Sequence, residues 1–240
     1  MKHLALHPWD VTPEQARQIQ LNLKSRLELA DRLEDIQHVA GADIALDPQA
    51  GMGIGGVVVY GWPGLVEIER QFARRKLTFP YVPGLLAFRE APVLLDAFEK
   101  LRSEPDLIFY DGHGYSHPRR FGITCHLGIL LDRPTIGCAK SRLIGHFEEP
   151  PLEAGAATPL CEGEERVGAV LRTRANVQPI FISQGHRVSL ETAVAWTLKV
   201  LDGYRIPKPT READHFVEMV KTNRWREEER KPNAQTAFGF

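Results

Sequence analysis

The segment Asp111–Arg120 brings together side chains that could bind a metal ion or a phosphate group and transfer protons. It holds one carboxylate, two histidines (His113 and His117) and two arginines, with glycines that let a ligand approach the backbone. The apolar run 107–110 directly precedes it and is typical of a buried strand in a parallel sheet. Open α/β sheets bind ligands at the carboxyl ends of such strands, so the segment predicts a functional loop. Taken alone, a polar turn in which Asp111 caps the following helix explains it equally well.

A second carboxylate, Asp43, lies in the middle of a predicted strand over residues 38–46. An unpaired carboxylate buried among small apolar neighbours is costly, so something must compensate it. A nearby arginine or a cap could do so, and so could a divalent cation shared with Asp111 from an adjacent strand. Mg²⁺ favours a few carboxylates together with water and substrate phosphates. Because two such ions can hold the attacking and leaving oxygens of a phosphodiester, the pair indicates phosphodiester hydrolysis.

The elements expected in the first part of the chain are one helix and three antiparallel strands. A helix start at Thr12, followed by a proline, predicts a helix over residues 12–37 outside the core. The strands are expected at residues 38–46, 57–60 and 66–72. The glycines in 51–56 have the spacing Gly-x-Gly-x-x-Gly, but a dinucleotide fingerprint must open a helix and a strand follows here. We therefore predict a hairpin loop at these glycines.

The rest of the chain is predicted to alternate helices and strands. One helix carries Leu94, Leu95, Phe98 and Leu101 at helical spacing, with Pro92 tolerable only in its first turn. Further strands are expected at residues 107–110, 134–139, 165–172 and 179–183, and further helices through 126–130, over 189–201 and from about 211. Residues 146–165 are predicted to form a loop, and the tail after Arg226 to be disordered.

This order of elements predicts an α/β fold of the ribonuclease H-like class. That plan has a five-stranded mixed central sheet with helices on both faces. No linker divides the sequence, so we expect a single domain over residues 1–240, with about 227–240 as a flexible tail.

The composition fits an enzyme that binds phosphates only locally. The chain has 240 residues, a net charge of −1 and 43% hydrophobic residues, so no global field draws it to nucleic acid or to a membrane. The three cysteines are too few and too scattered for a disulfide framework or a Cys-x-x-Cys metal site, and Cys125 and Cys138 are expected in the core. Without a signal-peptide pattern or an apolar run of membrane-spanning length, we expect a cytoplasmic protein.

Taken together, several segments of the sequence resemble the endonuclease V family, the deoxyinosine 3′ endonucleases. They occur in family order and cover most of the chain, and the second and third together are highly specific. The segments are the strand 39–44 with Asp43, the run 80–90, Asp111–Gly114 with His117–Arg119, residues 137–141, and residues 206–214.

The resemblance implies a metal site and the residues around it. It assigns Asp43, Glu90 and Asp111 to the metal and places Asp214 at a fourth position, although His215 follows directly and leaves open which of the two faces the site. It also places Lys140 near the active site. The implied cofactor is Mg²⁺, for which Mn²⁺ substitutes.

The resemblance further implies that the substrate is nucleic acid containing inosine, whose hypoxanthine base is flipped into a pocket. Tyr81 would enter the duplex as a wedge, and cleavage would fall at the second phosphodiester bond 3′ to the lesion. Double- or single-stranded DNA is the expected partner, with inosine-containing RNA as an alternative, and the protein is expected to act as a monomer. The residues implied in substrate binding are Pro80, Tyr81, Val82, Pro83, Gly84, Leu85, Leu86, Gly112, Arg119, Ile123 and Leu143.

Physical arguments support some of these roles separately. A base must leave the duplex stack to be inspected, and a tyrosine held between prolines can replace the lost stacking. Without the resemblance, Pro80–Pro83 is an ordinary rigid turn with a surface tyrosine. His117 is predicted to act in the active site, by contacting a phosphate or moving a proton, or alternatively to brace the loop through a backbone carbonyl. A structural or second-sphere role is expected for His113.

Two rival functions share part of this evidence. A structure-specific nuclease or resolvase of the same fold would use the same carboxylates but would need neither a wedge at Tyr81 nor a base pocket. A catalytically silent nucleic-acid-binding module would need no carboxylates. The presence of all four, Asp43, Glu90, Asp111 and Asp214, argues against it.

Overall fold

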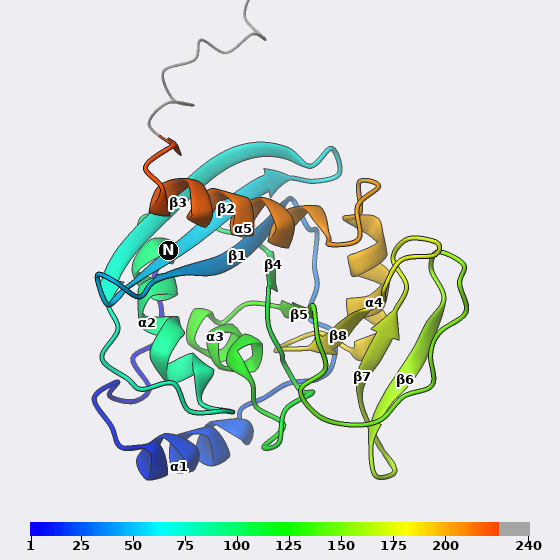
Figure 1. Ribbon diagram of the computed structural model, residues 1–240, viewed down its shortest axis with the longest axis horizontal. Helices are drawn as coiled ribbons and strands as arrows, with labels where there is room; N and C mark the ends of the chain where they lie inside the picture. Colours follow the sequence, from blue (N-terminus) through cyan, green and yellow to red (C-terminus); the bar gives the residue numbers. More distant parts are fainter. Residues whose placement is uncertain (226–240) are drawn as a thin grey trace, which may run out of the picture.

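The structure, a computed structural model, describes residues 1–225. Its strands and helices follow one another along the chain as drawn in Figure 1. The strands are β1 (His38–Asp47), β2 (Met52–Gly61), β3 (Val66–Lys76), β4 (Leu107–Tyr110), β5 (Thr135–Ala139), β6 (Ala157–Glu162), β7 (Glu165–Leu171) and β8 (Ile180–Gln184). The helices are α1 (Pro13–Lys24), α2 (Leu86–Phe98), α3 (Ile123–Leu131), α4 (Leu190–Lys199) and α5 (Lys208–Lys221).

The strands form one mixed sheet in the order β3-β2-β1-β4-β5-β8-β7-β6. β1, β4 and β5 run parallel in its middle, and the remaining neighbours pair antiparallel. The carboxyl ends of β1, β4 and β5 therefore meet at one edge, which is where a parallel sheet places its ligands.

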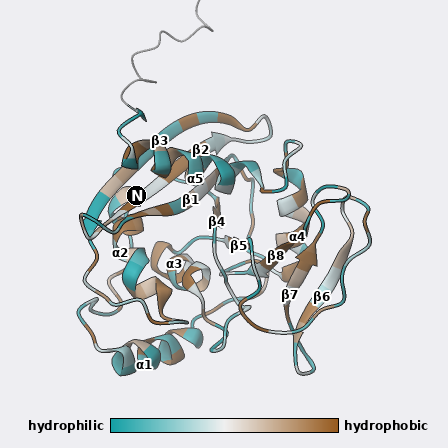
Figure 2. Ribbon diagram, viewed as in Figure 1, coloured by the Kyte–Doolittle hydropathy of each residue, from teal (hydrophilic) through white to brown (hydrophobic). Residues whose placement is uncertain are grey.

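The two faces of the sheet carry separate apolar cores. α4 and α5 cover one face, where Val39, Phe109 and Cys138 pack with apolar residues of both helices. α2 and α3 cover the other face, packing on Ala40 and Ile108 among others. Figure 2 shows brown, apolar residues along the strands and α3, whereas α1 is mostly hydrophilic and lies apart from the sheet. Because side chains alternate along a strand, the members of the two cores show which face of the sheet each strand residue points to.

The α/β class is confirmed, but the prediction of a five-stranded sheet is wrong, since the sheet has eight strands. β8 pairs antiparallel with β5, and β7 and β6 extend the sheet beyond it. The predicted loop over residues 146–165 contains β6, which lies at the edge of the sheet and so tolerates Pro159.

The predicted helix over residues 12–37 is also too long. Thr12 does cap α1 in a capping box with Gln15, but the helix ends at Lys24. Leu33 and Ile36 instead pack against the core on the α5 face. The residues between Lys24 and β1 are therefore not helical.

The predicted hairpin loop is present but shorter than 51–56, because Gly51 lies in the turn between β1 and β2 whereas Gly53, Gly55 and Gly56 lie inside β2. Gly55 and Gly56 allow the helices on the two faces of the sheet to pack closely against β2. A Cβ at Gly55 would come 2.7 Å from the carbonyl oxygen of Val93 in α2, and one at Gly56 would come 2.5 Å from Val217 of α5.

Other boundaries differ by smaller amounts. α2 begins at Leu86, so Pro92 lies within the helix rather than in its first turn, and Leu101 lies beyond its end but is buried. α5 begins at Lys208 rather than near Arg211, with Pro209 in its first turn. Cys125 and Cys138 are buried as predicted. Within residues 1–225 no helix is long and apolar enough to cross a membrane. The predicted disordered tail lies outside the described residues.

Candidate active site

Three carboxylates, Asp43, Asp111 and Asp214, meet at the carboxyl edge of the parallel strands. One oxygen atom of each lies within 4.8 Å of those of the other two. Asp43 comes from β1, Asp111 follows β4, and Asp214 lies in α5. The side chain of Asp111 is 18% exposed and that of Asp214 is 43% exposed, so the cluster opens to solvent on one side.

The alternation of side chains explains why these residues face one another. In β1, Asp43 shares its face with Val39, which belongs to the core beneath α5. In β4, Asp111 continues the face of Phe109, and in β5, Lys140 continues the face of Cys138. All three thus address the side of the sheet that α5 covers, and α5 supplies Asp214.

Gly41 allows α5 to come close enough for this arrangement. A Cβ at Gly41 would lie 1.8 Å from the carbonyl oxygen of Pro209, in the first turn of α5. The helix therefore rests directly on the backbone of β1, two residues before Asp43. Any larger residue would move the helix and, with it, Asp214.

Lys140 bridges two of the three carboxylates. Its Nζ lies 2.6 Å from Oδ2 of Asp111 and 2.9 Å from Oδ2 of Asp214. Burial lowers the pKa of Lys140, but hydrogen bonds to Asp111 and Asp214 raise it above its ordinary value. Lys140 therefore stays cationic. Among the described residues, Asp43 forms no ion pair with Lys140 and accepts a single hydrogen bond, from the N–H of Ile44 at 2.7 Å.

Burial, together with the neighbouring carboxylates, raises the pKa values of Asp43 and Asp111. Burial, followed by the negative charges of Asp111 and Asp214, raises the pKa of Asp43 to about 8. Burial likewise raises the pKa of Asp111, against the opposing effect of Lys140. A pKa of about 8 leaves Asp43 largely protonated at neutral pH, and a positive partner would favour its ionised form, so these perturbed carboxyls mark a candidate functional site.

Glu90 approaches from the other face of the sheet. It lies in α2, one turn after the start of the helix, and is not among the three clustered carboxylates. Burial raises its pKa to about 7, and the charge of Asp111 adds to the effect, which places Glu90 near that side of the cluster.

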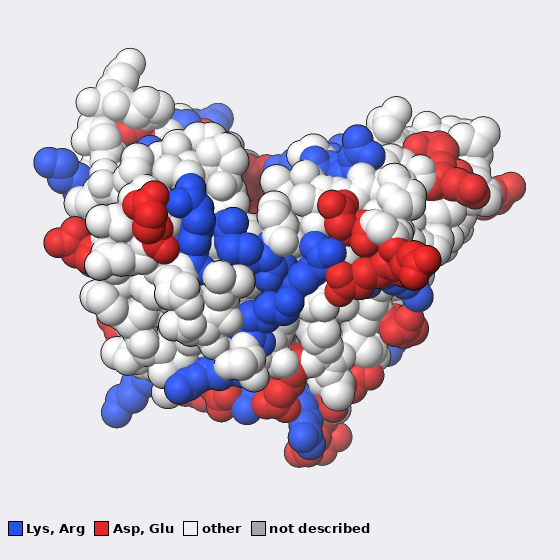
Figure 3. Space-filling model, turned by 90° about the horizontal axis from the view of Figure 1, so that it is seen from below, with Lys and Arg blue, Asp and Glu red and all other residues white. Residues whose placement is uncertain are grey.

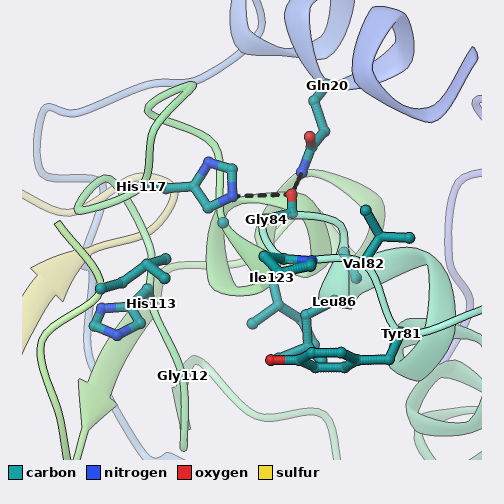
Figure 4. A pocket seen from close by; sticks show the side chains of 13 residues that line it. Gln20, Tyr81, Val82, Gly84, Leu86, Gly112, His113, His117 and Ile123 are labelled. Atoms are coloured by element: carbon teal, nitrogen blue, oxygen red, sulfur yellow. Dashed lines mark hydrogen bonds between the residues drawn. The ribbon is translucent and has the colours of Figure 1, made fainter. Parts of the chain in front are cut away.

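A pocket with a volume of about 130 Å³ opens next to the carboxylates. It is reached from Asp111 through the adjacent Gly112, and Tyr81 and Leu143 stand on its rim with exposures of 71% and 42%. Figure 4 shows Tyr81 and Gln20 on different sides of it. The lining residues are Gln20, Tyr81, Val82, Pro83, Gly84, Leu86, Ala87, Gly112, His113, His117, Gly122, Ile123 and Leu143.

Most of the residues predicted to bind substrate thus lie around one cavity, and three do not line it. Leu85 is fully buried beneath the loop, and Pro80 is exposed before it. Arg119 lies behind Gly84, where its Nη2 donates to the Gly84 carbonyl at 2.5 Å.

The Gly84 carbonyl holds the pocket loop in place. It accepts hydrogen bonds from Gln20 Nε2 at 3.1 Å and His117 Nε2 at 3.0 Å, in addition to Arg119 (Figure 4). Gly84 has a φ of +77°, and a Cβ there would lie 2.8 Å from Arg119 Nη2. The backbone conformation thus favours glycine, and a side chain there would also displace the end of Arg119.

Gln20 is a site residue that the sequence interpretation missed. It is 1% exposed, and its amide also donates to Phe121 O at 3.1 Å and accepts from Arg119 Nε at 2.6 Å. The available signal was its spacing, because Gln20 occupies the buried stripe of α1 with Ala16 and Leu23. A polar side chain in such a stripe needs partners.

The start of α2 and the start of α3 both meet the pocket. Leu86 and Ala87 open α2, Ile123 opens α3, and no side chain caps either helix. The first N–H groups of a helix have no partner within it, so this wall offers donors to a bound acceptor.

The two histidines of the loop are engaged by protein atoms. His117 is 3% exposed, its Nε2 faces the Gly84 carbonyl, and its Nδ1 accepts the Arg119 N–H at 3.2 Å. Burial lowers its pKa to about 4, so the ring is neutral. This geometry favours the bracing alternative over proton transfer. His113 Nδ1 lies 3.0 Å from the Ser116 hydroxyl, and burial lowers its pKa to about 4 as well.

Asp214 and His215 lie in different places. Asp214 joins the carboxylates, whereas His215 is exposed and lines a separate polar depression with Glu67, Arg70 and Glu212.

Known proteins resemble this chain along most of its length. A sequence model of the family described as Endonuclease V matches residues 21–215. The endonuclease V of Gloeobacter violaceus is 46% identical over 224 residues, covering 92% of this chain and 91% of that protein. The crystal structure of the Streptomyces avermitilis endonuclease V superposes with a TM-score of 0.86 at 41% identity, covering 90% of this chain and 96% of that one. The endonuclease V of Ciona intestinalis, in complex with a 24mer DNA containing an inosine followed by a ribo-adenosine, superposes with a TM-score of 0.78 at 27% identity, covering 88% and 98%.

Proposed function

Since the chain belongs to the endonuclease V family, we propose that it recognises the hypoxanthine base of inosine in nucleic acid and hydrolyses the second phosphodiester bond 3′ to it. The products would carry 3′-hydroxyl and 5′-phosphate ends. The observation that carries the proposal is the pocket, which lies one residue from Asp111 of the carboxylate cluster and has Tyr81 on its rim. A protein of this family solved with inosine-containing DNA supports the same substrate.

The carboxylate cluster fits a divalent cation. Its donors are oxygen atoms from Asp43, Asp111 and Asp214, the ligand type that Mg²⁺ takes, and Mn²⁺ accepts the same set. The raised pKa of Asp43 means that its ionised form is disfavoured, and a bound cation would favour that form. We assign Asp43, Asp111 and Asp214 as the residues that hold it, with Glu90 completing its surroundings. A bound divalent cation supplies a Lewis acid that stabilises charge on the phosphate.

The protein's own side chains have defined tasks around the scissile bond. Lys140 orients Asp111 and Asp214 and keeps a positive charge where a phosphate must lie. His117 and Arg119 hold the Gly84 carbonyl, and thereby the pocket loop, in position. Catalysis of phosphoryl transfer rests mainly on such positioning and on charge stabilisation.

Backbone donors in the pocket suit hypoxanthine better than adenine. Hypoxanthine carries an oxo group at position 6 where adenine carries an amino group. An N–H at the start of α2 or α3 can donate to the oxo group but would face the amino group unsatisfied, a difference of about 1–3 kcal/mol. The residues whose backbone or side chain would contact the base are Gly84, Leu85, Leu86, Gly112, Ile123 and Leu143.

Tyr81 is suited to hold the duplex open at the lesion. Its ring is 71% exposed, while Pro80 and Pro83 restrict the backbone on both sides, so little entropy is lost when the ring stacks. A resolvase of the same fold would use the carboxylates without this residue. We further propose that the chain is a single domain of the ribonuclease H-like class, since one mixed sheet runs through it, and that it acts as a monomer.

A panel of labelled substrates tests the function. Duplexes that contain one inosine, one uracil, one mismatch or a junction are incubated with the protein, with and without Mg²⁺, and an RNA strand containing inosine extends the panel. Cleavage restricted to inosine and dependent on the cation is expected. Asp43→Ala and Asp111→Ala should abolish cleavage while lesion binding persists. Preferred cutting of the junction would favour the resolvase, and binding without cutting the silent module.

A further inference from the structure

We propose that α1 and the adjoining loop form a basic surface that binds the nucleic-acid strand on the 5′ side of the inosine. The surface consists of Arg17 and Lys24 of α1 and Arg119 and Arg120 of the loop, and is called the α1 surface below. The inference rests on the proposed function, which places the bond to be cut, and hence the 3′ side, at the carboxylates.

The α1 surface is continuous, although its residues come from distant parts of the chain. Arg119 Nε donates to Gln20 of α1 at 2.6 Å, and the nearby charge of Arg17 adds to burial in lowering the pKa of Arg119. On the other side, Arg120 lies 2.8 Å from Glu165, a carboxylate that also senses the charge of Lys24. Figure 3, seen from below and thus onto α1, shows Lys and Arg side chains in a band across this face.

Charge remains on this surface after its internal pairs are counted. Glu14 pairs with Arg17 at 3.2 Å and Glu165 with Arg120, and both acids are well exposed. Within residues 1–225, no ion pair engages Lys24 or Arg119. The exposed pair of Glu14 and Arg17 contributes little and yields readily to a phosphate, whereas Arg120 is 14% exposed and stays paired with Glu165. On a chain with a net charge of −1, such a local excess is where phosphates would bind.

The position of the pocket gives the surface its direction. Gly112 links one end of the pocket to the carboxylates, and Gln20 of α1 lines another side. These two residues lie far apart in Figure 4. A strand whose flipped base fills the pocket, and whose 3′ phosphates reach Asp111, leaves on its 5′ side toward Gln20 and α1.

The dimensions of α1 fit this role. Arg17 and Lys24 are seven residues apart and lie on similar sides of the helix, about 10 Å along its axis. That length corresponds to about three phosphates of one strand. Gln20, between them, ties the helix to the pocket loop through Gly84 and to the neighbouring loop through Phe121. α1 otherwise contributes only Ala16 and Leu23 as buried residues, so its polar surface is available for binding.

The test compares substrates with the inosine near one end or the other of the labelled strand. One has a long 5′ flank and a short 3′ flank, and the second has the reverse. Binding is measured by fluorescence anisotropy without divalent cation, across a range of salt concentrations. The variant is Arg17→Gln/Lys24→Gln, and the matched control is Lys100→Gln/Arg102→Gln, two exposed cations before β4, at the end of that strand opposite Asp111.

On the 5′-flanked substrate, the salt slope of the Arg17→Gln/Lys24→Gln variant should fall by about two, one for each cation, while the control keeps the wild-type slope. On the 3′-flanked substrate the variant should match the wild type. An equal loss on both substrates, a loss on the 3′-flanked one alone, or no loss would overturn the assignment. If the wild type itself binds inosine-containing and undamaged DNA equally, the proposed function fails instead.

Discussion

Replacing Asp43 by asparagine should stabilise the cation-free protein while destroying its activity. The substitution keeps the shape of the side chain and an oxygen that can accept the Ile44 N–H. It removes the charge that burial and the neighbouring carboxylates disfavour. A site built for a cation is costly when the cation is missing, and this variant measures that cost.

The magnitude follows from the pKa of Asp43, which is raised from 3.8 to about 8. The pKa of this carboxyl is higher in the folded than in the unfolded protein. Below the pKa of the unfolded state the group does not affect stability, and stability is lost as the pH rises from there through the pKa of the folded state. The loss therefore builds up between about pH 4 and pH 8. The full difference corresponds to at most about 6 kcal/mol. Because the cluster opens to water, screening reduces this, and we expect about 1–3 kcal/mol, or roughly 2–10 °C in melting temperature.

The assay is thermal unfolding in EDTA from pH 5 to pH 9. The melting temperature of Asp43→Asn should exceed that of the wild type at pH 8, and the gap should shrink toward pH 5. Adding Mg²⁺ at pH 8 should raise the melting temperature of the wild type and leave that of the variant unchanged. Asp10→Asn, at an exposed site in the N-terminal segment, serves as the control and should track the wild type. A variant no more stable than the wild type at pH 8, or a gap independent of pH, would refute the reasoning.

Three further substitutions test the pocket and its surroundings. Tyr81→Ala should lose about 1–3 kcal/mol of affinity for inosine-containing duplex, and less for single strands; equal losses on undamaged duplex would remove the wedge assignment. Gly84→Ala places a Cβ 2.8 Å from Arg119 at a φ of +77° and should cost about 1–3 kcal/mol of stability and reduce discrimination between inosine and adenosine; unchanged binding and melting would show that the loop adapts freely. Lys140→Met removes the group that opposes the raised pKa of Asp111 and should shift the acid limb of the pH–rate profile to higher pH, whereas an unshifted profile would separate Lys140 from the carboxylates.

The strand-borne part of the site could be predicted from the sequence because strand geometry is regular. An apolar run ending in Asp111 and a second ending in Lys140 identify the carboxyl edge of a parallel sheet. Asp43 stood out as a charge inside a strand. Alternation within each strand then places the three side chains on one face, and the structure has them there.

The extent of the sheet was not predicted, although most of its strands were. The segments 165–172 and 179–183 were correctly identified as strands, close to β7 and β8. The count of five came from the ribonuclease H-like plan rather than from the strands themselves. Antiparallel pairing of β8 with β5 is a long-range contact that no local pattern records. β6 was missed because it lies within residues 146–165, a segment rich in Glu, Pro and Gly that predicts a loop.

The residues that support the pocket were the hardest to foresee. Gln20 acts through hydrogen bonds to Gly84 and Phe121, which are 64 and 101 residues away in the sequence. Such partners are set by how α1 docks, and that docking depends on a few buried contacts. The buried stripe of the helix could indicate that Gln20 faces inward, but not what it meets.

The position of Asp214 joins these observations into one argument. Its charge is useful only if α5 lies against β1, and α5 can lie there only because Gly41 has no side chain. The same contact adds to the rise in the pKa of Asp43, which is due first to burial and next to Asp111, because it brings the charge of Asp214 within 4.8 Å. The packing that assembles the carboxylates therefore also creates the electrostatic cost that a cation relieves. The carboxylate cluster and α5 therefore form one structural unit, in which the packing of α5 against β1 offsets the repulsion between the carboxylates.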